Sequence, residues 1–458
     1  MTSTSGTRDM RAPNRRMRWC LAACTVAALH APAPMEAQTR ESRLDRVFTG
    51  LAYRPVLPDE VGAATGMSDH VTEHPSGATS IVSPHDETVR YRIDDHVYRS
   101  QDGGATWSAI SPRFLAGSTS EEPGQGAVVG AGGASADAEG RSALTALAES
   151  PLEPGLLWVG GAEGRLHLTR DGGASWAELD GPAGAGEHVR AIEASTHRGG
   201  RAYVVTRAEG EGEPDEPGPL VYMTDDYGAE WTLLSGEFSG LPQDEPVTVV
   251  REDPVRQGLL FAGTPVGVFV TFDDGGSWDL FQFGLPDTPV MDLTILGRDL
   301  VVSLADGALW VMDEIGPLRQ VMDGLTTGEP YLFEPSPIYL DRLPADQGIA
   351  DARGAIFDYL LPSIVRTVRL EVLDSEARVL TTFSGVRQPG ARSSDVSESE
   401  FRRVPGTRSG VHRIVWDLHA ASSEAGPVER VPPGSYLLRM TVDGLVRERA
   451  FEVVSERP

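Results

Sequence analysis

The sequence contains no lysine, so all 40 of its basic residues are arginine. They are outnumbered by 67 aspartate and glutamate residues, and the formal net charge is −27 at pH 7. Proteins that bind nucleic acid need a basic surface that displaces counterions from the phosphates. This charge balance argues against nucleic acid as a partner and favours a chain whose copies repel one another.

Cysteine is almost absent as well, because the chain has only Cys20 and Cys24. Both lie in an N-terminal segment with the pattern of an export signal: several arginines, an apolar stretch over 19–31, and a small-residue cleavage point before Gln38. We expect residues 1–37 to be a signal peptide and the protein to be periplasmic or secreted. The mature chain then has no disulfide, no thiol nucleophile and no cysteine-ligated metal.

Long hydrophobic runs are missing too. The N-terminal apolar stretch is shorter than the ~20 residues that span a bilayer, and no later segment is apolar enough. The sequence Leu-Ala-Ala-Cys ending at Cys24 resembles a lipoprotein box, but Cys24 lies near the start of the apolar stretch, which argues against a lipid anchor. We therefore predict no membrane span once the signal is removed.

Helical apolar stripes are scarce, whereas glycine (51) and proline (33) are abundant, which is typical of an all-β protein. A turn of the form Ser/Thr-x-Asp-x-Gly-x-Ser/Thr-Trp recurs four times, although the third copy has Glu230 in place of the second Ser/Thr. The Asp accepts backbone hydrogen bonds within its turn, the Gly allows a positive φ, and the Trp packs on a neighbouring sheet. We assign these structural roles to Asp102, Gly104 and Trp107; to Asp171, Gly173 and Trp176; to Asp226, Gly228 and Trp231; and to Asp273, Gly275 and Trp278.

A unit of about four strands surrounds each turn, and a fifth unit without a good turn follows over 290–311. Repeated small sheets that cannot bury both faces alone are typical of a β-propeller. We predict a propeller over 44–317 with five readable blades and a low-complexity insertion at 117–140. Strands within 44–61 can help to close the ring, which allows five to seven blades.

The repeat stops after Pro317. We expect residues 318–350 to form a Pro-rich, extended connector. New strand patterns then follow over 351–456, separated by turns such as Asp443-Gly444. They predict an Ig-like β-sandwich as the second domain.

The four turns resemble the Asp-box, or BNR, repeats of sialidase and sortilin (Vps10) propellers. The chain as a whole resembles exported bacterial BNR-repeat proteins that are often labelled glycosyl hydrolases, and the stretches 47–54, 309–313 and 330–335 match that group. The segments 414–417 and 433–436 resemble the Ig-like module of flagellar hook-capping proteins. The resemblance covers nearly all of the mature chain, although these relatives usually have a second propeller, and it implies a fold rather than an activity.

Two local patterns resemble catalytic motifs without completing them. Tyr-Arg-Ile-Asp at 91–94 resembles the Tyr-Arg-Ile-Pro motif of sialidases, but the proline is missing and Arg92 falls on the strand next to the first turn. His70-x-x-Glu73-His74 matches a zinc-peptidase pattern that requires a helix, yet Pro75 follows at once. We therefore interpret Arg92 as a strand residue and predict no metal site and no cofactor.

A glycoside hydrolase needs two carboxylates ~5–10 Å apart across the scissile bond. In a propeller they project from the innermost strands, which line the central channel. Glu193 and Asp292 occupy such strands, and Arg190 and Arg251 can line the same channel. Ion pairs with these arginines explain the carboxylates equally well, so we assign no catalytic residue.

The function that these patterns favour is non-catalytic. We expect a binding or scaffold protein that presents its propeller surface to a protein or glycan ligand outside the cytoplasm. The main alternative is a glycoside hydrolase, sialidase-like or polysaccharide-degrading, with catalytic carboxylates at the channel. A third hypothesis is an assembly factor like the propellers that help to build photosystem II.

Overall fold

The structure is a computed structural model of the 458-residue chain. It describes residues 44, 47–48, 51–56, 72–73, 79–114, 144–182, 187–208, 220–243, 245–340, 354–387, 404–420 and 430–455. The predicted signal peptide and the insertion at 117–140 lie outside these residues. None of the helices in the described part is long and apolar enough to cross a bilayer.

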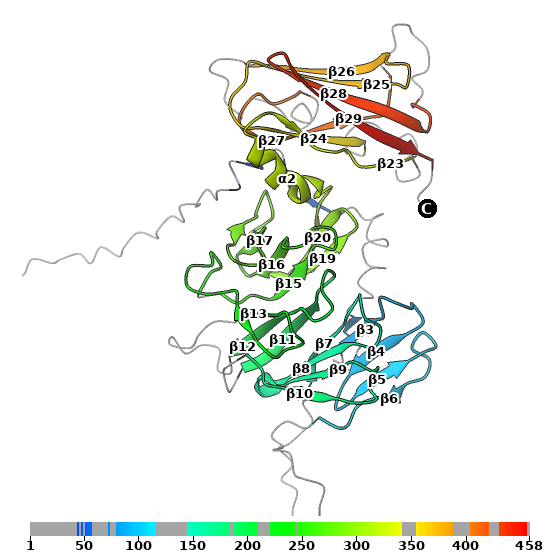
Figure 1. The fold of residues 1–458 in the computed structure, drawn as a ribbon, viewed down its shortest axis with the longest axis vertical. Coiled ribbons are helices and arrows are strands. Elements are labelled where there is room, and N and C mark those ends of the chain that lie inside the picture. The colour runs from blue at the N-terminus through cyan, green and yellow to red at the C-terminus, as the bar shows by residue number, and fades with distance from the viewer. Residues whose placement is uncertain are drawn as a thin grey trace, which may run out of the picture. The chain divides into compact units, whose positions relative to one another are not determined.

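Four antiparallel sheets follow one another along the chain as up-and-down meanders (Figure 1). Blade 1 contains β2 (Thr72–Glu73), β3 (Thr79–Val82), β4 (Arg90–Ile93), β5 (Val97–Ser100) and β6 (Ser108–Ala109). Blade 2 contains β7 (Leu144–Glu149), β8 (Leu157–Gly161), β9 (Leu166–Thr169) and β10 (Ala177–Leu179). Blade 3 contains β11 (Glu187–Ala194), β12 (Ala202–Ala208), β13 (Val221–Thr224) and β14 (Thr232–Leu233). Blade 4 contains β15 (Val249–Glu252), β16 (Leu260–Thr264), β17 (Gly267–Thr271) and β18 (Asp279–Leu280).

A fifth sheet combines both ends of the repeat region. Its first three strands are β19 (Val290–Leu296), β20 (Asp299–Leu304) and β21 (Leu309–Met312), and its outer strand is β1 (Arg54–Pro55) from the beginning of the described chain. Arg54 lies opposite Val311 in the ladder, and its Nε is 2.6 Å from Asp313 Oδ2. The predicted all-β propeller is confirmed, with five blades among the described residues.

Apolar side chains hold each blade to the next. Blades 1 and 2 share one buried cluster, blades 2 and 3 a second, blades 3 and 4 a third, and blades 4 and 5 a fourth. Each fully buried Leu, Val or Phe stabilises the fold by roughly 1.5–3 kcal/mol relative to exposure. The first strands β7, β11, β15 and β19 lie next to one another in this order, so their side chains share one region of the propeller.

The four aspartate turns, defined by Asp102, Asp171, Asp226 and Asp273, share one hydrogen-bond pattern, apart from one bond that the third turn lacks. In the first, Asp102 Oδ1 accepts from Ser100 Oγ (2.7 Å) and Thr106 N (2.8 Å), and Oδ2 accepts from Thr106 Oγ1 (2.6 Å). These bonds, that of the Thr106 hydroxyl foremost, lower the pKa of Asp102 to about 2. The Asp102 carboxylate is therefore ionised at neutral pH, and both of its oxygens accept hydrogen bonds from within the same turn.

Two of the turn tryptophans also join neighbouring blades. Trp176 of blade 2 donates from Nε1 to the carbonyl of Ile110 (2.8 Å), and Trp231 of blade 3 donates to that of Asp180 (3.0 Å). The indole thus packs and hydrogen-bonds at once, as aromatic residues with a polar edge do. Each of these turns ties its blade to the backbone of the preceding one.

The segment expected to be an extended connector, 318–350, is not extended throughout. It contains most of helix α2 (Gly316–Thr327) and the short strands β22 (Tyr331–Leu332) and β23 (Ile338–Tyr339). Pro317 occupies the first helical turn, where its missing N–H costs nothing, and Gly328 (φ 64°) ends the helix. Leu318 and Val321 lie one turn apart and are both buried, so a tertiary contact stabilises the helix.

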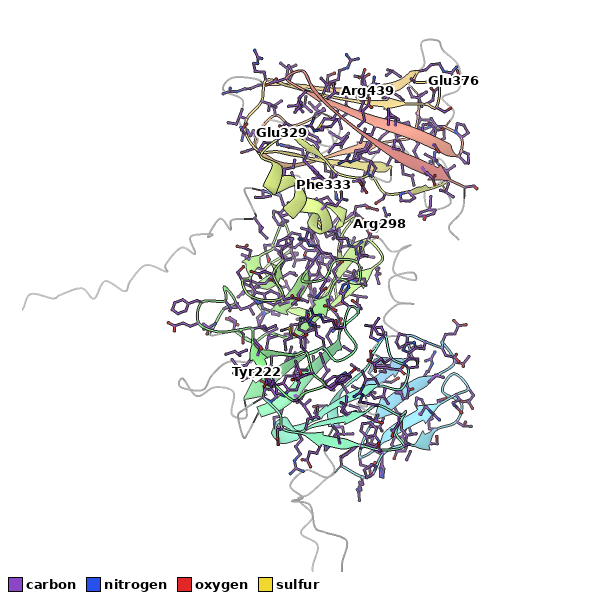
Figure 2. The ribbon with its side chains drawn as sticks, viewed as in Figure 1. Tyr222, Arg298, Glu329, Phe333, Glu376 and Arg439 are labelled. Atoms are coloured by element: carbon purple, nitrogen blue, oxygen red, sulfur yellow. The ribbon has the colours of Figure 1, made fainter. Side chains whose placement is uncertain are left out.

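The C-terminal strands form two sheets around one core. The smaller contains β22, β24 (Ala355–Leu361) and β27 (Gly410–Trp416); the larger contains β23, β25 (Thr367–Leu373), β26 (Val379–Val386), β28 (Gly434–Val442) and β29 (Leu445–Val454). Both sheets contribute to a single buried cluster that includes Phe357, Trp416 and Phe451. On the surface, Arg439 pairs with Glu448 across β28 and β29 at 2.6 Å (Figure 2). That this sandwich is Ig-like stays a prediction.

The third aspartate turn offers a test of the turn chemistry. Glu230 N donates to Asp226 Oδ1 (2.9 Å), but Glu230 has no hydroxyl to reach the second oxygen as Thr106, Ser175 and Ser277 do in the other turns. We expect Glu230→Ser to raise the midpoint of thermal unfolding by about 1 °C. Glu230→Ala, measured beside it by calorimetry, removes the same side chain without adding the bond. Equal midpoints for the two variants contradict this account.

Candidate functional site

The structure brings together three of the four residues predicted to face the channel. Glu193 lies on β11, Arg251 on β15 and Asp292 on β19, the first strands of blades 3, 4 and 5. Arg251 Nη1 is 3.3 Å from Glu193 Oε2, and Nη2 is 2.8 Å from Asp292 Oδ1. We call this group the inner-strand ion cluster.

The Arg251 guanidinium is fixed by the backbone as well. Its Nε donates to the carbonyl of Leu293 (2.9 Å) and its Nη1 to that of Val250 (3.1 Å). All three nitrogens are thereby engaged, and the side chain is only 20% exposed. Arg251 is therefore held in place between the two carboxylates, and one guanidinium links three blades.

Arg190, the fourth channel candidate, has a different contact. It is the extra residue of a bulge in β11, between Val189 and Ala191. Its Nε donates to the carbonyl of Thr248 (3.2 Å) at the start of blade 4. This bond links blade 3 to the backbone of blade 4.

Burial and charge act in opposite directions on Glu193. Desolvation raises the pKa of this carboxyl to about 7, although the positive charge of Arg251 and the N–H of Glu252 lower it. The negative charge of Asp292 adds to the rise. Asp292 is more open to solvent, with 41% of its side chain exposed. The cluster therefore holds one carboxyl whose pKa is raised to about 7.

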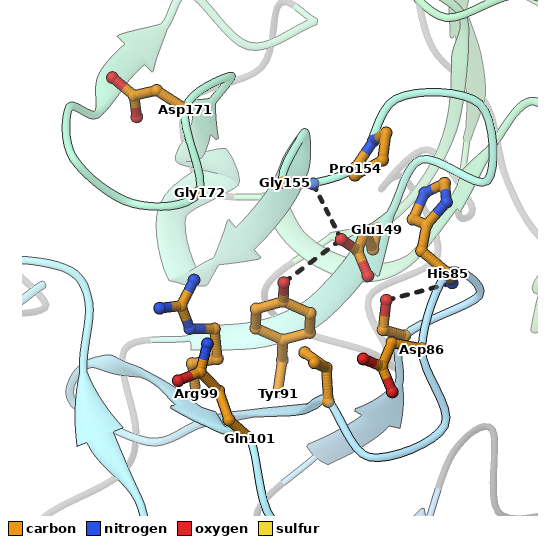
Figure 3. A pocket seen from close by; sticks show the side chains of 12 residues that line it. His85, Asp86, Tyr91, Arg99, Gln101, Glu149, Pro154, Gly155, Asp171 and Gly172 are labelled. Carbon is orange, nitrogen blue, oxygen red and sulfur yellow. Dashed lines mark hydrogen bonds between the residues drawn. The ribbon is translucent and has the colours of Figure 1, made fainter.

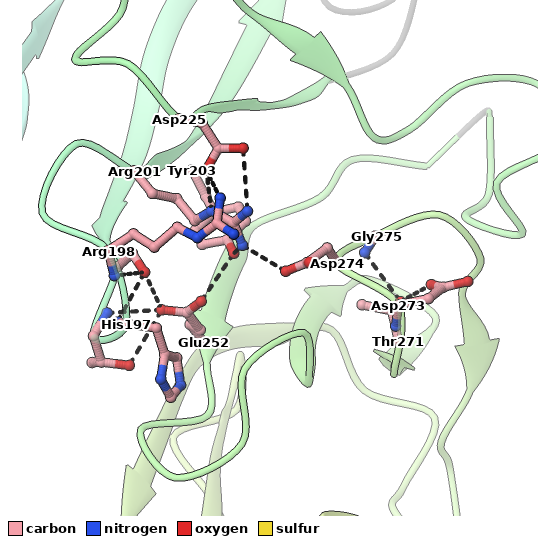
Figure 4. A network of polar contacts seen from close by, with 12 residues as sticks. His197, Arg198, Arg201, Tyr203, Asp225, Glu252, Thr271, Asp273, Asp274 and Gly275 are labelled. Carbon is pink, nitrogen blue, oxygen red and sulfur yellow. Dashed lines mark hydrogen bonds and ion pairs between the residues drawn. The ribbon is translucent and has the colours of Figure 1, made fainter. Parts of the chain in front are cut away.

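A second polar network, which sequence reasoning missed, joins blades 3 and 4 (Figure 4). Arg201 is only 3% exposed and pairs from Nε with Asp225 Oδ1 (2.6 Å) and from Nη1 with Asp274 Oδ1 (2.6 Å). Beside it, Tyr203 donates to Glu252 Oε1 (3.0 Å). The signal was present in the sequence, because Asp225 and Asp274 each adjoin a turn aspartate and the turn itself needs only one carboxylate.

Glu252 is fully satisfied despite its burial at 2% exposure. Its Oε2 accepts from Ser195 Oγ (2.7 Å), Thr196 N (2.7 Å) and Thr196 Oγ1 (3.2 Å), while Oε1 accepts from Tyr203. A buried carboxylate is tolerated when every lone pair has a donor. This network holds two blades together.

The structure also places the two sequence patterns that resemble catalytic motifs, the one around Arg92 and the one around Glu73. Arg92 lies over the rings of Tyr98 and Trp107, 4.9 and 4.7 Å from their centroids, so it packs within blade 1. Glu73 belongs to strand β2 rather than to a helix, and His70 and His74 lie outside the described residues. A zinc pattern that depends on helical spacing does not form at Glu73.

The fold is that of an all-β propeller protein. Comparison with known proteins finds similar solved structures but assigns no family. No known family model matches the sequence. No curated protein matches it either.

Several solved structures are similar to part of the chain. The GH74 xyloglucanase of Xanthomonas campestris is 16% identical with a TM-score of 0.38, over 62% of this chain and 42% of that one. A GH74 enzyme of Niastella koreensis is 12% identical with a TM-score of 0.36, over 61% and 41%. YCF48 from Cyanidioschyzon merolae is 15% identical with a TM-score of 0.25, over 48% and 68%. This chain thus spans less than half the length of the two GH74 enzymes, and likeness at these TM-scores identifies neither an activity nor a ligand.

The raised pKa of Glu193 predicts a pH-dependent stability. Its ordinary value is 4.5 and its value in the fold is about 7, so the folded state binds more protons than the unfolded state between these pH values. The free energy of unfolding of the wild type therefore falls as pH rises through this window. Gln cannot ionise, so we expect the stability of Glu193→Gln relative to wild type to increase by about 2 kcal/mol from pH 5 to pH 8.

Urea unfolding at the two pH values measures this difference. Asp292→Asn, which removes the other carboxylate that pairs with Arg251, is the matched control over the same pH range. A relative stability of Glu193→Gln that is the same at pH 5 and pH 8 contradicts the assignment.

Proposed function

We propose that the protein is a non-catalytic binding or scaffold protein that works outside the cytoplasm. The observation that carries this proposal is the position of Arg251, whose guanidinium pairs with Glu193 at 3.3 Å and Asp292 at 2.8 Å. A hydrolase needs an acid and a base or nucleophile on opposite sides of a sugar bond. Here both carboxylates face one fixed cation, so the space between them is occupied.

The inner-strand ion cluster fits a role in joining blades. Removing one partner of a partly buried ion pair leaves an uncompensated charge, which is costly, whereas the intact cluster adds contacts between three first strands. The Arg201 and Glu252 network is similar, because each of its carboxylates accepts hydrogen bonds from neighbouring side chains. On this account the charged groups of the inner-strand ion cluster and of the Arg201 and Glu252 network serve to hold blades 3 to 5 together.

A glycoside hydrolase is the second candidate, and one observation favours it. The pKa of Glu193, raised to about 7 by burial, is the property of a general acid that works at neutral pH. Asp292 would then be the second carboxylate of the pair. This reading requires Arg251 to move away from both carboxylates when a glycan binds.

A turnover assay separates the two candidates. Purified protein is incubated with sialosides and with a panel of polysaccharides, and released reducing ends are measured. We expect no rate above that of the double variant Glu193→Gln/Asp292→Asn. Hydrolysis that falls about 100-fold or more in each single variant overturns the non-catalytic proposal.

Work outside the cytoplasm rests on the N-terminal sequence, with its arginines, its apolar stretch over 19–31 and its cleavage point before Gln38. The full chain, expressed in a bacterium with an outer membrane, should appear in the periplasm or medium with Gln38 as its first residue by mass spectrometry. A chain that lacks residues 1–37 is the control and should stay in the cytoplasm. Intact full-length chain found only in the cytoplasm contradicts export.

A further inference from the structure

Two junctions between blades are built on the same plan. Between blades 3 and 4, Tyr203 on β12 donates to Glu252 Oε1 at 3.0 Å. Between blades 1 and 2, Tyr91 on β4 donates to Glu149 Oε1 at 3.3 Å. Strand β4 pairs with β3 as β12 pairs with β11, and in each case the glutamate is the last residue of the next blade's first strand.

A histidine contact repeats in the same way. His197 Nε2 lies 2.8 Å from the carbonyl of Asp253, and His85 Nε2 lies 2.8 Å from that of Ser150. The serine two residues before each histidine accepts the histidine N–H, at 3.1 and 3.2 Å. The two junctions can therefore be compared position by position.

The first difference leaves a carboxylate oxygen without donors. At the junction between blades 3 and 4, which we call the filled junction, Glu252 Oε2 accepts from Ser195 and from both the N–H and the hydroxyl of Thr196. Pro84 stands at the position of Thr196 and can supply neither group. Glu149 is 7% exposed, and its Oε2 is buried with no hydrogen-bond partner among the described residues.

The second difference leaves a guanidinium without carboxylates. Arg201 is paired with Asp225 and Asp274, but the equivalent positions at the other junction are Gln101 and Gly172. A guanidinium is still present there, supplied by Arg99 on the neighbouring strand β5. Its positive charge acts on the Tyr91 hydroxyl, and its Nε is buried without a hydrogen-bond partner among the described residues.

These substitutions leave a cavity of about 330 Å³ between blades 1 and 2 (Figure 3). Val89 stands where Arg201 fills the other junction, and Gly172 provides no side chain. The lining residues that matter here are Val89, Tyr91, Arg99, Gln101, Glu149 and Gly172. This volume is at the lower end of the ~300–1,000 Å³ typical of ligand pockets, and suits a molecule of monosaccharide size.

We propose that this cavity binds a small hydroxy acid, with the ligand's carboxylate on Arg99 and a hydroxyl of the ligand donating to Glu149 Oε2. The ligand supplies what the chain itself provides at the junction between blades 3 and 4: a carboxylate for the guanidinium, as Asp225 and Asp274 do, and a hydroxyl donor for the glutamate, as Thr196 does. The inference adds a ligand class to the binding function proposed above, at a site separate from the inner-strand ion cluster.

The chemistry of the cavity favours a hydroxy acid over two simpler ligands. A neutral sugar satisfies Glu149 but gives the Arg99 guanidinium no carboxylate with which to form an ion pair. A simple carboxylate such as acetate pairs with Arg99 but leaves Glu149 Oε2 without a donor, and a buried polar atom without a hydrogen bond weakens binding. Asp171 also lines the cavity, but both of its oxygens accept hydrogen bonds within its own turn.

Calorimetric titration of the purified protein tests the ligand class. D-glucuronate and D-glycerate are the probes, D-glucose lacks the carboxylate, and acetate lacks the hydroxyl. We expect at least one hydroxy acid to bind saturably, about tenfold or more tightly than glucose and acetate. Absence of saturable binding by both hydroxy acids at millimolar concentrations overturns the proposal, as does equal affinity for glucose.

Two variants built from the filled junction test the residues. Gly172→Asp copies Asp274, whose φ of 60° is close to the 68° of Gly172, and its carboxylate would pair with Arg99. A Cβ on Gly172 would lie 3.7 Å from Arg99 Nη1, so the side chain has room. Arg99→Met copies Met223, the residue at the same position of blade 3.

We expect each variant to weaken hydroxy-acid binding about tenfold or more while the midpoint of thermal unfolding shows that both fold. Arg113→Met, which removes a surface arginine with 60% of its side chain exposed, is the control and should bind as wild type does. Unchanged affinity in folded Gly172→Asp and Arg99→Met overturns the assignment. The turnover assay reports on the inner-strand ion cluster alone, so the two proposals can fail separately.

Discussion

The fold depends on how one small sheet is fastened to the next. A four-stranded blade cannot bury both of its faces alone, so its stability comes from the clusters that it shares with its neighbours. The buried glutamate that ends a first strand reinforces this contact, since Glu252 accepts a hydrogen bond from Tyr203 of the preceding blade. A carboxylate is tolerated there only because its remaining lone pairs are filled. At Glu149, one carboxylate oxygen is buried with no hydrogen-bond partner in the part of the chain that the structure describes.

Because acidic residues are in excess, the largely buried arginines Arg251 and Arg201 are important for neutralising carboxylates between the blades. Arg251 and Arg201 each pair with two carboxylates from different blades, so a single guanidinium neutralises two carboxylates and joins two blades. A planar guanidinium with several donors suits this role better than an ammonium group, which agrees with a sequence whose basic residues are all arginine. The charges of the inner-strand ion cluster thereby join blades, and the proposed ligand site lies at the junction between blades 1 and 2.

Local patterns in the sequence were enough to predict the all-β propeller, because each aspartate turn fixes a hairpin and the alternation beside it fixes the strands. The pairing of Glu193 and Asp292 with Arg251 could be expected only as one of two explanations, since side chains on three different strands meet there. Helix α2 was missed because prolines and glycines near it suggested a connector, whereas burial of Leu318 favours the helix. The cavity was missed for another reason: it results from residues that are lacking, and these become visible only when two junctions are superposed.

We hold that the charges of the inner-strand ion cluster pair with one another and that the ligand binds in the cavity between blades 1 and 2. A crystal structure of the protein soaked with D-glucuronate and D-glycerate tests both statements at once. The account predicts ligand density between blades 1 and 2, with the ligand's carboxylate on Arg99 and a hydroxyl within hydrogen-bond distance of Glu149 Oε2, while Arg251 stays between Glu193 and Asp292. Density for the ligand between Glu193 and Asp292, with Arg251 displaced and the junction between blades 1 and 2 empty, would contradict it.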